Sequence, residues 1–180
     1  LQQGGFELTG EAHGADVLLV NTCAFIESSK AESVDAILEL ADIKAENPNA
    51  RLVVAGCLSQ RHAPELALEI PEVDLFIGTG EYDKLADALD LRDLRDGSAP
   101  TRKPRPEYIA DHLAPRYVPS GSYSSYLKIA EGCSQGCAFC IIPKLRGVQR
   151  SRTVADVVAE ARALVDVGVV ELNLVAQDLT

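Results

Sequence analysis

Three cysteines close together in the second half of the chain limit most strongly what it can form. Cys133, Cys137 and Cys140 follow the spacing C-x3-C-x2-C, and Gly132 and Gly136 give this segment the backbone freedom of a loop. Three thiolates on one short loop can converge on a single inorganic centre, and soft thiolates are the usual ligands of iron–sulfur clusters. A four-iron cluster held by protein alone takes four cysteines. The spacing therefore indicates a cluster loop that leaves one iron open for a substrate or cofactor.

Two other uses of these cysteines stay open. A structural zinc site needs four ligands, commonly paired as C-x2-C with a second pair or with histidines. The nearest histidine, His112, lies 21 residues before Cys133 in a proline-rich stretch. The second alternative is a disulfide with one thiol left over, although the cysteine count of five is odd and the sequence shows no signal peptide.

Length and composition indicate the class of protein. The 180 residues suggest one full domain and part of a second. No apolar run approaches the roughly 18 residues of a membrane span, so no membrane partner is expected. Five cysteines without a secretory signal fit a reducing compartment and metal ligation. We therefore predict a cytoplasmic protein.

The charges are divided unevenly along the chain. Residues 1–100 carry 7 Lys and Arg against 19 Asp and Glu, a net charge of −12, whereas residues 101–180 carry a net charge of +2. Phosphate contacts need clustered cations, so contact with nucleic acid is expected only indirectly or through parts beyond this chain. The acidic half suits either a basic protein partner or a solvated surface that keeps the protein in solution.

Residues 1–97 alternate between strand-like and helix-like patterns. Short apolar runs at 17–20, 51–55 and 74–77 are typical of buried parallel strands. An apolar stripe that includes Val34, Ile37 and Ala41 predicts a helix, and further helices are predicted over 64–70 and 82–91. Alternating β and α elements favour a parallel sheet covered by helices. We predict an α/β domain of the Rossmann or flavodoxin type.

Cys23 and Cys57 each come just after a predicted strand of this domain. Open α/β sheets place their ligands beyond the carboxyl ends of the strands. Two cysteines at equivalent strand ends can therefore meet in space although 34 residues separate them. Buried, inert thiols are the alternative.

Residues 98–122 hold five of the nine prolines and predict an irregular linker. Its cations at 102, 103 and 105 are candidates for RNA contact, with a solvated connector as the alternative. From residue 123 a strand, the cysteine loop, a helix and a second strand are predicted. This order fits the start of a (β/α) barrel, whose reactive groups lie beyond the strand C-termini. We predict that residues 123–180 begin such a domain.

The helix of this second domain has clear sequence signals. Thr153 with Asp156 resembles a capping box, and Gly168 ends the apolar pattern. The residues predicted to form its buried stripe are Val154, Val157, Val158, Ala161, Leu164 and Val165. Gln177 and Asp178 follow the next strand, where a plain polar turn is the alternative to a ligand contact.

The segments around the cysteines resemble a known family. The matching strings are Val20–Cys23, Ala55–Cys57, Tyr126–Cys133, Phe139–Gly147 and Ser151–Arg152. Together they resemble the radical SAM methylthiotransferases, which insert sulfur into a C–H bond and cap it with a methyl group. The resemblance extends over most of the chain, and it implies S-adenosylmethionine (SAM) and two 4Fe-4S clusters as cofactors.

The resemblance also implies roles for individual residues. Cys133, Cys137 and Cys140 would ligate the cluster whose open iron binds SAM. Phe139 and Gln177 would belong to the same cofactor site. Because hydrogen abstraction by a SAM-derived radical needs no acid–base group, no catalytic side chain is predicted.

In the family, an auxiliary cluster is held by three cysteines of the N-terminal domain. Cys23 and Cys57 would be two of these ligands, and the third would lie before Leu1. The remaining strands of the barrel would follow Thr180. We therefore expect an internal fragment of a longer enzyme, without activity by itself. Arg146 and Arg152 are candidates for orienting the substrate or the SAM carboxylate, with ordinary salt bridges as the alternative.

The stretch Asn21–Ser33 resembles the branch of the family that modifies an aspartate of a small-subunit ribosomal protein, which would be the partner and substrate. The branch that modifies an adenosine of transfer RNA tends to carry a basic residue where Phe25 and Ile26 stand, and it is the runner-up. An iron–sulfur electron-transfer protein, whose cluster has no open position, is the alternative of another class. Neither an electron donor nor a sulfur carrier is indicated by the sequence.

Overall fold

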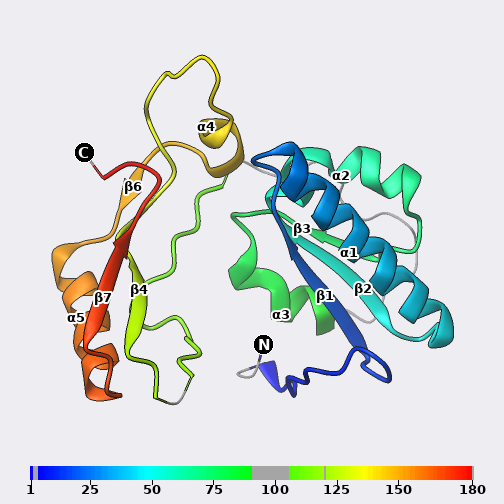
Figure 1. Cartoon of the computed structure of the whole chain (residues 1–180), viewed down its shortest axis with the longest axis horizontal. Helices are drawn as coiled ribbons and strands as arrows, with labels where there is room; N and C mark the ends of the chain where they lie inside the picture. The colour runs from blue at the N-terminus through cyan, green and yellow to red at the C-terminus, as the bar shows by residue number, and fades with distance from the viewer. Residues whose placement is uncertain (2–3, 91–105, 120, 180) are drawn as a thin grey trace. The chain divides into compact units, whose positions relative to one another are not determined.

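The structure is a computed structural model that describes residues 1, 4–90, 106–119 and 121–179 (Figure 1). The chain divides into two compact units, Leu1–Pro106 and Glu107–Thr180. Each unit has a hydrophobic core of its own.

A parallel sheet of three strands forms the centre of the first unit. β1 (Val17–Thr22), β2 (Arg51–Gly56) and β3 (Leu75–Ile77) are hydrogen-bonded in the order β1–β2–β3. The middle strand is apolar and buried from its second residue to its last, as expected for a strand covered on both faces. The predicted α/β fold with a parallel sheet is confirmed.

Helices cover this sheet. α1 (Glu27–Glu46) packs against β1 and β2, and α2 (Cys57–Glu69) packs against β2 and β3. The short η2 (Tyr82–Lys84) leads into α3 (Leu85–Asp90), which contributes to the core of the unit. The buried residues of this core are Val53, Ala55, Leu75, Ile77 and Leu89. Within the parts of the chain that the structure describes, no helix is long and apolar enough to cross a membrane.

α2 is longer than the sequence predicted, because the apolar pattern revealed only its second part. The helix is kinked at His62, whose backbone lies outside the helical region (φ −126°, ψ 17°). Pro64 lies two residues after the kink, where its missing N–H is tolerated as in a first helical turn. The predicted helix over 64–70 corresponds to the stretch after this kink, and the stretch before it begins at Cys57.

The second unit contains two parallel strands joined through a helix. β4 (Ser124–Lys128) pairs with β7 (Glu171–Val175), and α5 (Val154–Asp166) packs against β4. Their buried core consists of Leu127, Leu164 and Val169. The predicted order of strand, loop, helix and strand is correct, and the barrel that it would begin stays a prediction.

α5 begins as predicted but is less buried than predicted. Thr153 Oγ1 accepts a hydrogen bond from the Asp156 N–H at 3.3 Å, which caps the helix. Within the predicted stripe only Leu164 is fully buried, and Val154 is 80% exposed. Within the described residues, the two strands of this unit cover only part of the helix surface, so Val154, Val158 and Val165 are exposed.

The predicted linker lies partly outside the described residues, which exclude 91–105 and 120 and so the cations at 102, 103 and 105. Residues 106–119 contain neither helix nor strand. Val118 nevertheless packs against the core of the second unit, and Arg116 pairs with Glu160 of α5. The predicted domain limits of 1–97 and 123–180 stay a prediction.

Candidate metal centre

The three neighbouring cysteines lie on a loop that is closed at its base by a short pair of strands. Residues 132–149 run between β5 (Ala130–Glu131) and β6 (Arg150–Ser151), which pair antiparallel. Figure 1 shows this cysteine loop in yellow, extending beyond the ends of β4 and β7. The short α4 (Ile142–Arg146) belongs to its second half.

At its base, the two ends of the cysteine loop touch through their backbones. The Cys133 N–H donates to the Gly147 carbonyl at 3.2 Å. Gly132 has a φ of +80°, and a Cβ at this position would lie 2.4 Å from the Val148 carbonyl oxygen. A side chain at 132 would therefore both strain the backbone and push the ends of the loop apart.

The thiols themselves differ in exposure. Cys133 is buried, Cys137 is exposed and Cys140 is intermediate, and none is in a disulfide. The Cys140 N–H donates to the Cys137 carbonyl at 3.1 Å. Outside the masked segments, no three His, Cys, Asp or Glu side chains are arranged to hold a metal ion. Three thiols on one loop fit an iron–sulfur cluster in their chemistry, but the structure does not gather them around one point.

Phe139 and Gln177, the other residues predicted for the cofactor site, have different surroundings. The Phe139 side chain is 94% exposed. Gln177 follows β7, and its Oε1 accepts a hydrogen bond from the Gly132 N–H at 2.8 Å. The structure therefore brings Gln177 to the cysteine loop, and contact of either residue with a cofactor stays a prediction.

Asp178 also contacts the loop. Its Oδ2 accepts a hydrogen bond from Gln135 Nε2 at 2.9 Å and lies 3.9 Å from Cys133 Sγ. Its backbone carbonyl accepts from Gln149 Nε2 at 3.4 Å. Side chains near both ends of the cysteine loop are thus bonded to the residue that follows Gln177.

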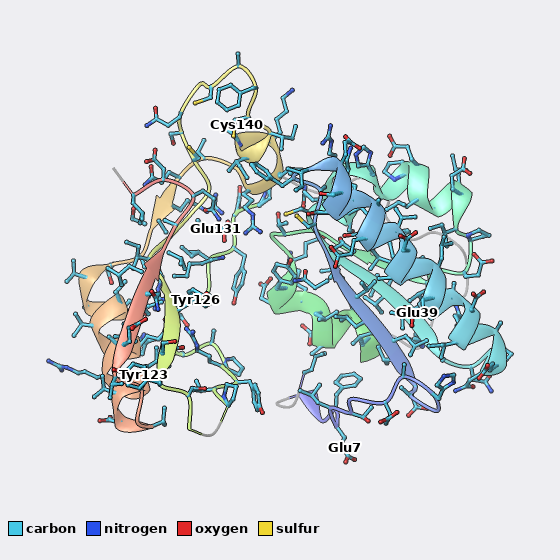
Figure 2. The ribbon with its side chains drawn as sticks, in the orientation of Figure 1. Glu7, Glu39, Tyr123, Tyr126, Glu131 and Cys140 are labelled. Atoms are coloured by element: carbon cyan, nitrogen blue, oxygen red, sulfur yellow. The ribbon has the colours of Figure 1, made fainter. Side chains whose placement is uncertain are left out.

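A buried carboxylate lies directly before the loop. Glu131 is 7% exposed and accepts hydrogen bonds from Lys128 and from Arg146, the latter at 2.9 Å (Figure 2 labels Glu131 and Cys140). Burial alone would raise the pKa of Glu131, but the hydrogen bonds from the two cations outweigh it and hold the pKa below its ordinary value. Arg146 is therefore in a salt bridge that joins α4 to β5.

Arg152 is also engaged within the second unit. Its side chain is 3% exposed, and the guanidinium pairs with Asp156 and Glu160 of α5. Hydrogen bonds from Arg152 and from the His112 backbone hold the pKa of Asp156 well below its ordinary value. Both arginines considered for orienting a ligand thus form salt bridges in this structure.

The sequence did not predict the salt bridges of Glu131 or the contacts of Asp178 with the cysteine loop. For Glu131, the available signal for a buried ion pair was an acidic residue between Ala130 and Gly132, two positions before the first cysteine. The contacts of Asp178 join residues 29 to 45 positions apart and follow from the pairing of β4 with β7, which no local pattern reveals.

Cys23 and Cys57 lie in the first unit at neighbouring strand ends. Thr22 and Gly56 are partners in the β1–β2 register, and each cysteine is the next residue. Gly56 has a φ of +103°, and a Cβ there would lie 2.5 Å from the Thr22 carbonyl oxygen. Cys57 is buried, whereas Cys23 is exposed and donates its backbone N–H to Ser33 Oγ at 3.0 Å. The two cysteines follow the same sheet edge as predicted, and their role as cluster ligands stays a prediction.

The sequence of the chain is similar to those of known proteins. Residues 1–78 match the uncharacterized protein family UPF0004. The whole chain is 55% identical to the ribosomal protein uS12 methylthiotransferase RimO of Anaeromyxobacter sp. (strain Fw109-5) and 53% identical to that of Myxococcus xanthus (strain DK1622). The corresponding protein of Geobacter sulfurreducens is 46% identical.

These alignments cover 100% of the chain but only 37% of the first two relatives and 40% of the third. The chain thus spans about two fifths of the length of the curated relatives it matches. By its similarity to them along all of its residues, the chain belongs to the methylthiotransferase family.

Proposed function

We propose that the chain is part of a radical SAM enzyme that adds a methylthio group to the β-carbon of an aspartate in ribosomal protein uS12. The observation that carries the proposal is 46–55% identity, along the whole chain, with relatives named for methylthiolation of this protein. The closed loop with three thiols supports it, because thiols of this number suit a cluster with an open iron.

The proposed cofactors are SAM and two 4Fe-4S clusters. Cys133, Cys137 and Cys140 would hold the cluster that binds SAM, and Cys23 and Cys57 would hold part of the auxiliary cluster. When bound, these groups supply the one-electron chemistry that activates an unreactive C–H bond and the sulfur that is added to it.

The chain's own residues would position these groups. The Gly147 carbonyl holds the Cys133 N–H, so the first thiol stays at the base of the loop and buried from water. Glu131 fixes α4, and with it the second half of the loop, through Arg146. No side chain of this chain is assigned a proton-transfer step.

The charge of the chain suits the proposed substrate. A protein that binds ribosomal RNA presents cations to phosphates. Residues 1–100 carry a net charge of −12, which attracts such a protein. In this proposal the enzyme works in the cytoplasm, where ribosomes are assembled.

The test is mass spectrometry of ribosomal proteins and transfer RNA from a strain that lacks the gene. We expect uS12 to lose the mass of one methylthio group and to regain it when the intact gene is returned, but not when the gene carries Cys133→Ala. A lesion in transfer RNA with uS12 unchanged would assign the enzyme to the other branch. If neither molecule changes and the purified protein does not cleave SAM, an electron-transfer role replaces the proposal.

A further inference from the structure

We propose that Gln177 and Asp178, which follow β7 closely, are positioning residues that hold the base of the cysteine loop in place before its cofactor binds. The contacts that carry this inference are properties of the chain, while the identity of the cofactor rests on the proposed function. Neither residue needs to touch the cofactor for this role.

Gln177 acts on the backbone of the loop. Its Oε1 accepts the Gly132 N–H at 2.8 Å, and the next N–H, from Cys133, donates to Gly147 at 3.2 Å. Two successive backbone N–H groups thus have different acceptors. Gln177, outside the loop, accepts from Gly132, and Gly147, within the loop, accepts from Cys133. Since Gly132 has the freest backbone of any residue type, these bonds set the direction in which Cys133 leaves β5.

Asp178 acts on the side chains of the loop. Its carboxylate holds Gln135 at 2.9 Å, and the Gln135 N–H donates in turn to Cys133 Sγ at 3.4 Å. Its backbone carbonyl accepts from Gln149 Nε2, and the Gln149 N–H donates to Ser134 Oγ at 3.1 Å. A single residue outside the loop therefore connects with both of its ends.

This arrangement matters most for a centre with three protein ligands. With one thiolate fewer than a closed site, affinity depends more on how well the loop is held before the centre binds. Residues that orient metal ligands commonly change affinity about 10- to 100-fold when they are replaced. The Asp178 carboxylate lies 3.9 Å from Cys133 Sγ, so its negative charge would lower the reduction potential of a centre bound there.

The first test measures amide hydrogen exchange in the 180-residue chain without metal. In Gln177→Leu the Gly132 amide should exchange roughly fivefold faster or more, as for the loss of one ordinary hydrogen bond. Gln177→Glu keeps an acceptor of the same reach and should restore slow exchange. Asn173→Ala, at an exposed position of the preceding strand β7, is the matched control. Equal exchange in Gln177→Leu and wild type, or an unprotected Gly132 in wild type, would overturn the inference.

The second test loads the same variants with iron and sulfide under anaerobic conditions. Gln177→Leu should release its iron to a chelator at about tenfold lower concentration, and Gln177→Glu should behave as wild type. Asp178→Asn keeps an acceptor for Gln135 but removes the charge, so the bound centre should become easier to reduce. An unchanged potential would remove Asp178 from the proposal. If the wild-type chain takes up no iron, its loop by itself does not hold the centre, while hydrogen exchange still decides the positioning role of Gln177 and SAM cleavage by the intact enzyme decides the proposed function.

Discussion

Gly132 is a residue at which the cysteine loop tolerates little change. In Gly132→Ala the new methyl group would meet the Val148 carbonyl oxygen at 2.4 Å, at a φ of +80° that L-residues rarely adopt. We expect the free energy of unfolding to fall by roughly 1–3 kcal/mol. Chemical denaturation, followed by circular dichroism, measures this change.

Gly136 in the same loop provides the control. Nothing lies within 4 Å of a Cβ at this position, and its φ is not positive. Gly136→Ala should leave stability within about 0.5 kcal/mol of wild type. If both alanine variants unfold at the same denaturant concentration, the contact at the base of the loop does not contribute as described.

The thiols of the loop are expected to be individually indispensable. Replacing Cys133, Cys137 or Cys140 by Ala removes one of three ligands that the loop supplies, so each variant should fail to assemble an intact four-iron cluster. Iron and sulfide analysis after anaerobic reconstitution measures the loss, and Gly136→Ala again serves as the control. Full cluster content in all three cysteine variants would remove this loop as the binding site.

Glu131 is expected to make the stability of the second unit depend on pH. Its folded-state pKa lies below the ordinary value, so the contribution of the carboxylate is complete above the unfolded pKa of about 4.3 and is lost as the pH falls through the lower folded value. The stability difference between wild type and Glu131→Gln should therefore shrink below about pH 4.3. Urea unfolding at neutral and acidic pH measures it, with the exposed Glu171→Gln as control. A difference that is constant with pH would contradict the ion pair.

At the scale of whole elements, α5 depends on its cap. Thr153→Ala removes the hydroxyl that accepts the Asp156 N–H and should lower the free energy of unfolding by about 1 kcal/mol. Thr153→Ser keeps an oxygen in the same place and should retain most of the stability. Thermal unfolding of the two variants tests this, and equal losses would show that the methyl group rather than the cap matters.

Elements with an apolar run or a helical period could be predicted from the sequence, and those without one could not. Apolar runs located β1, β2 and β3, and helical spacing of apolar residues located α1 and α5. β5, β6 and α4 have between two and five residues, and no such pattern marks them. The exposed side of α5 was mispredicted because apolar residues at helical spacing do not reveal how many strands cover them.

The residues of the candidate site could be predicted where their type alone indicates their chemistry. Cys133, Cys137 and Cys140 stand out by identity and spacing, and Cys23 and Cys57 by their place after strands. The bonds that hold the loop, by contrast, depend on strand register and on backbone groups, which every residue has.

At the scale of the molecule, we expect the 180-residue chain alone to give no methylthiolated product. The relatives named for this activity are chains of which it spans 37–40%. In the second unit, Val154, Val170 and Leu174 are more than half exposed, so apolar surface is left uncovered by the described residues. Incubation with uS12, SAM and a reductant, followed by mass spectrometry, is the measurement. Methylthiolated uS12 formed by this chain would contradict the prediction and show that its 180 residues suffice for the reaction.

The supports of the cysteine loop also impose an order in time. Cys140 is synthesised 38 residues before Asp178, which at about 5–20 residues per second is an interval of roughly 2–8 s. Until β7 pairs with β4, the Gly132 N–H and the Gln135 side chain lack the partners that hold them in the finished fold. The loop of a nascent chain is therefore still unsupported when its last cysteine appears. We therefore expect a metal centre to be inserted after β7 has been synthesised and has paired with β4.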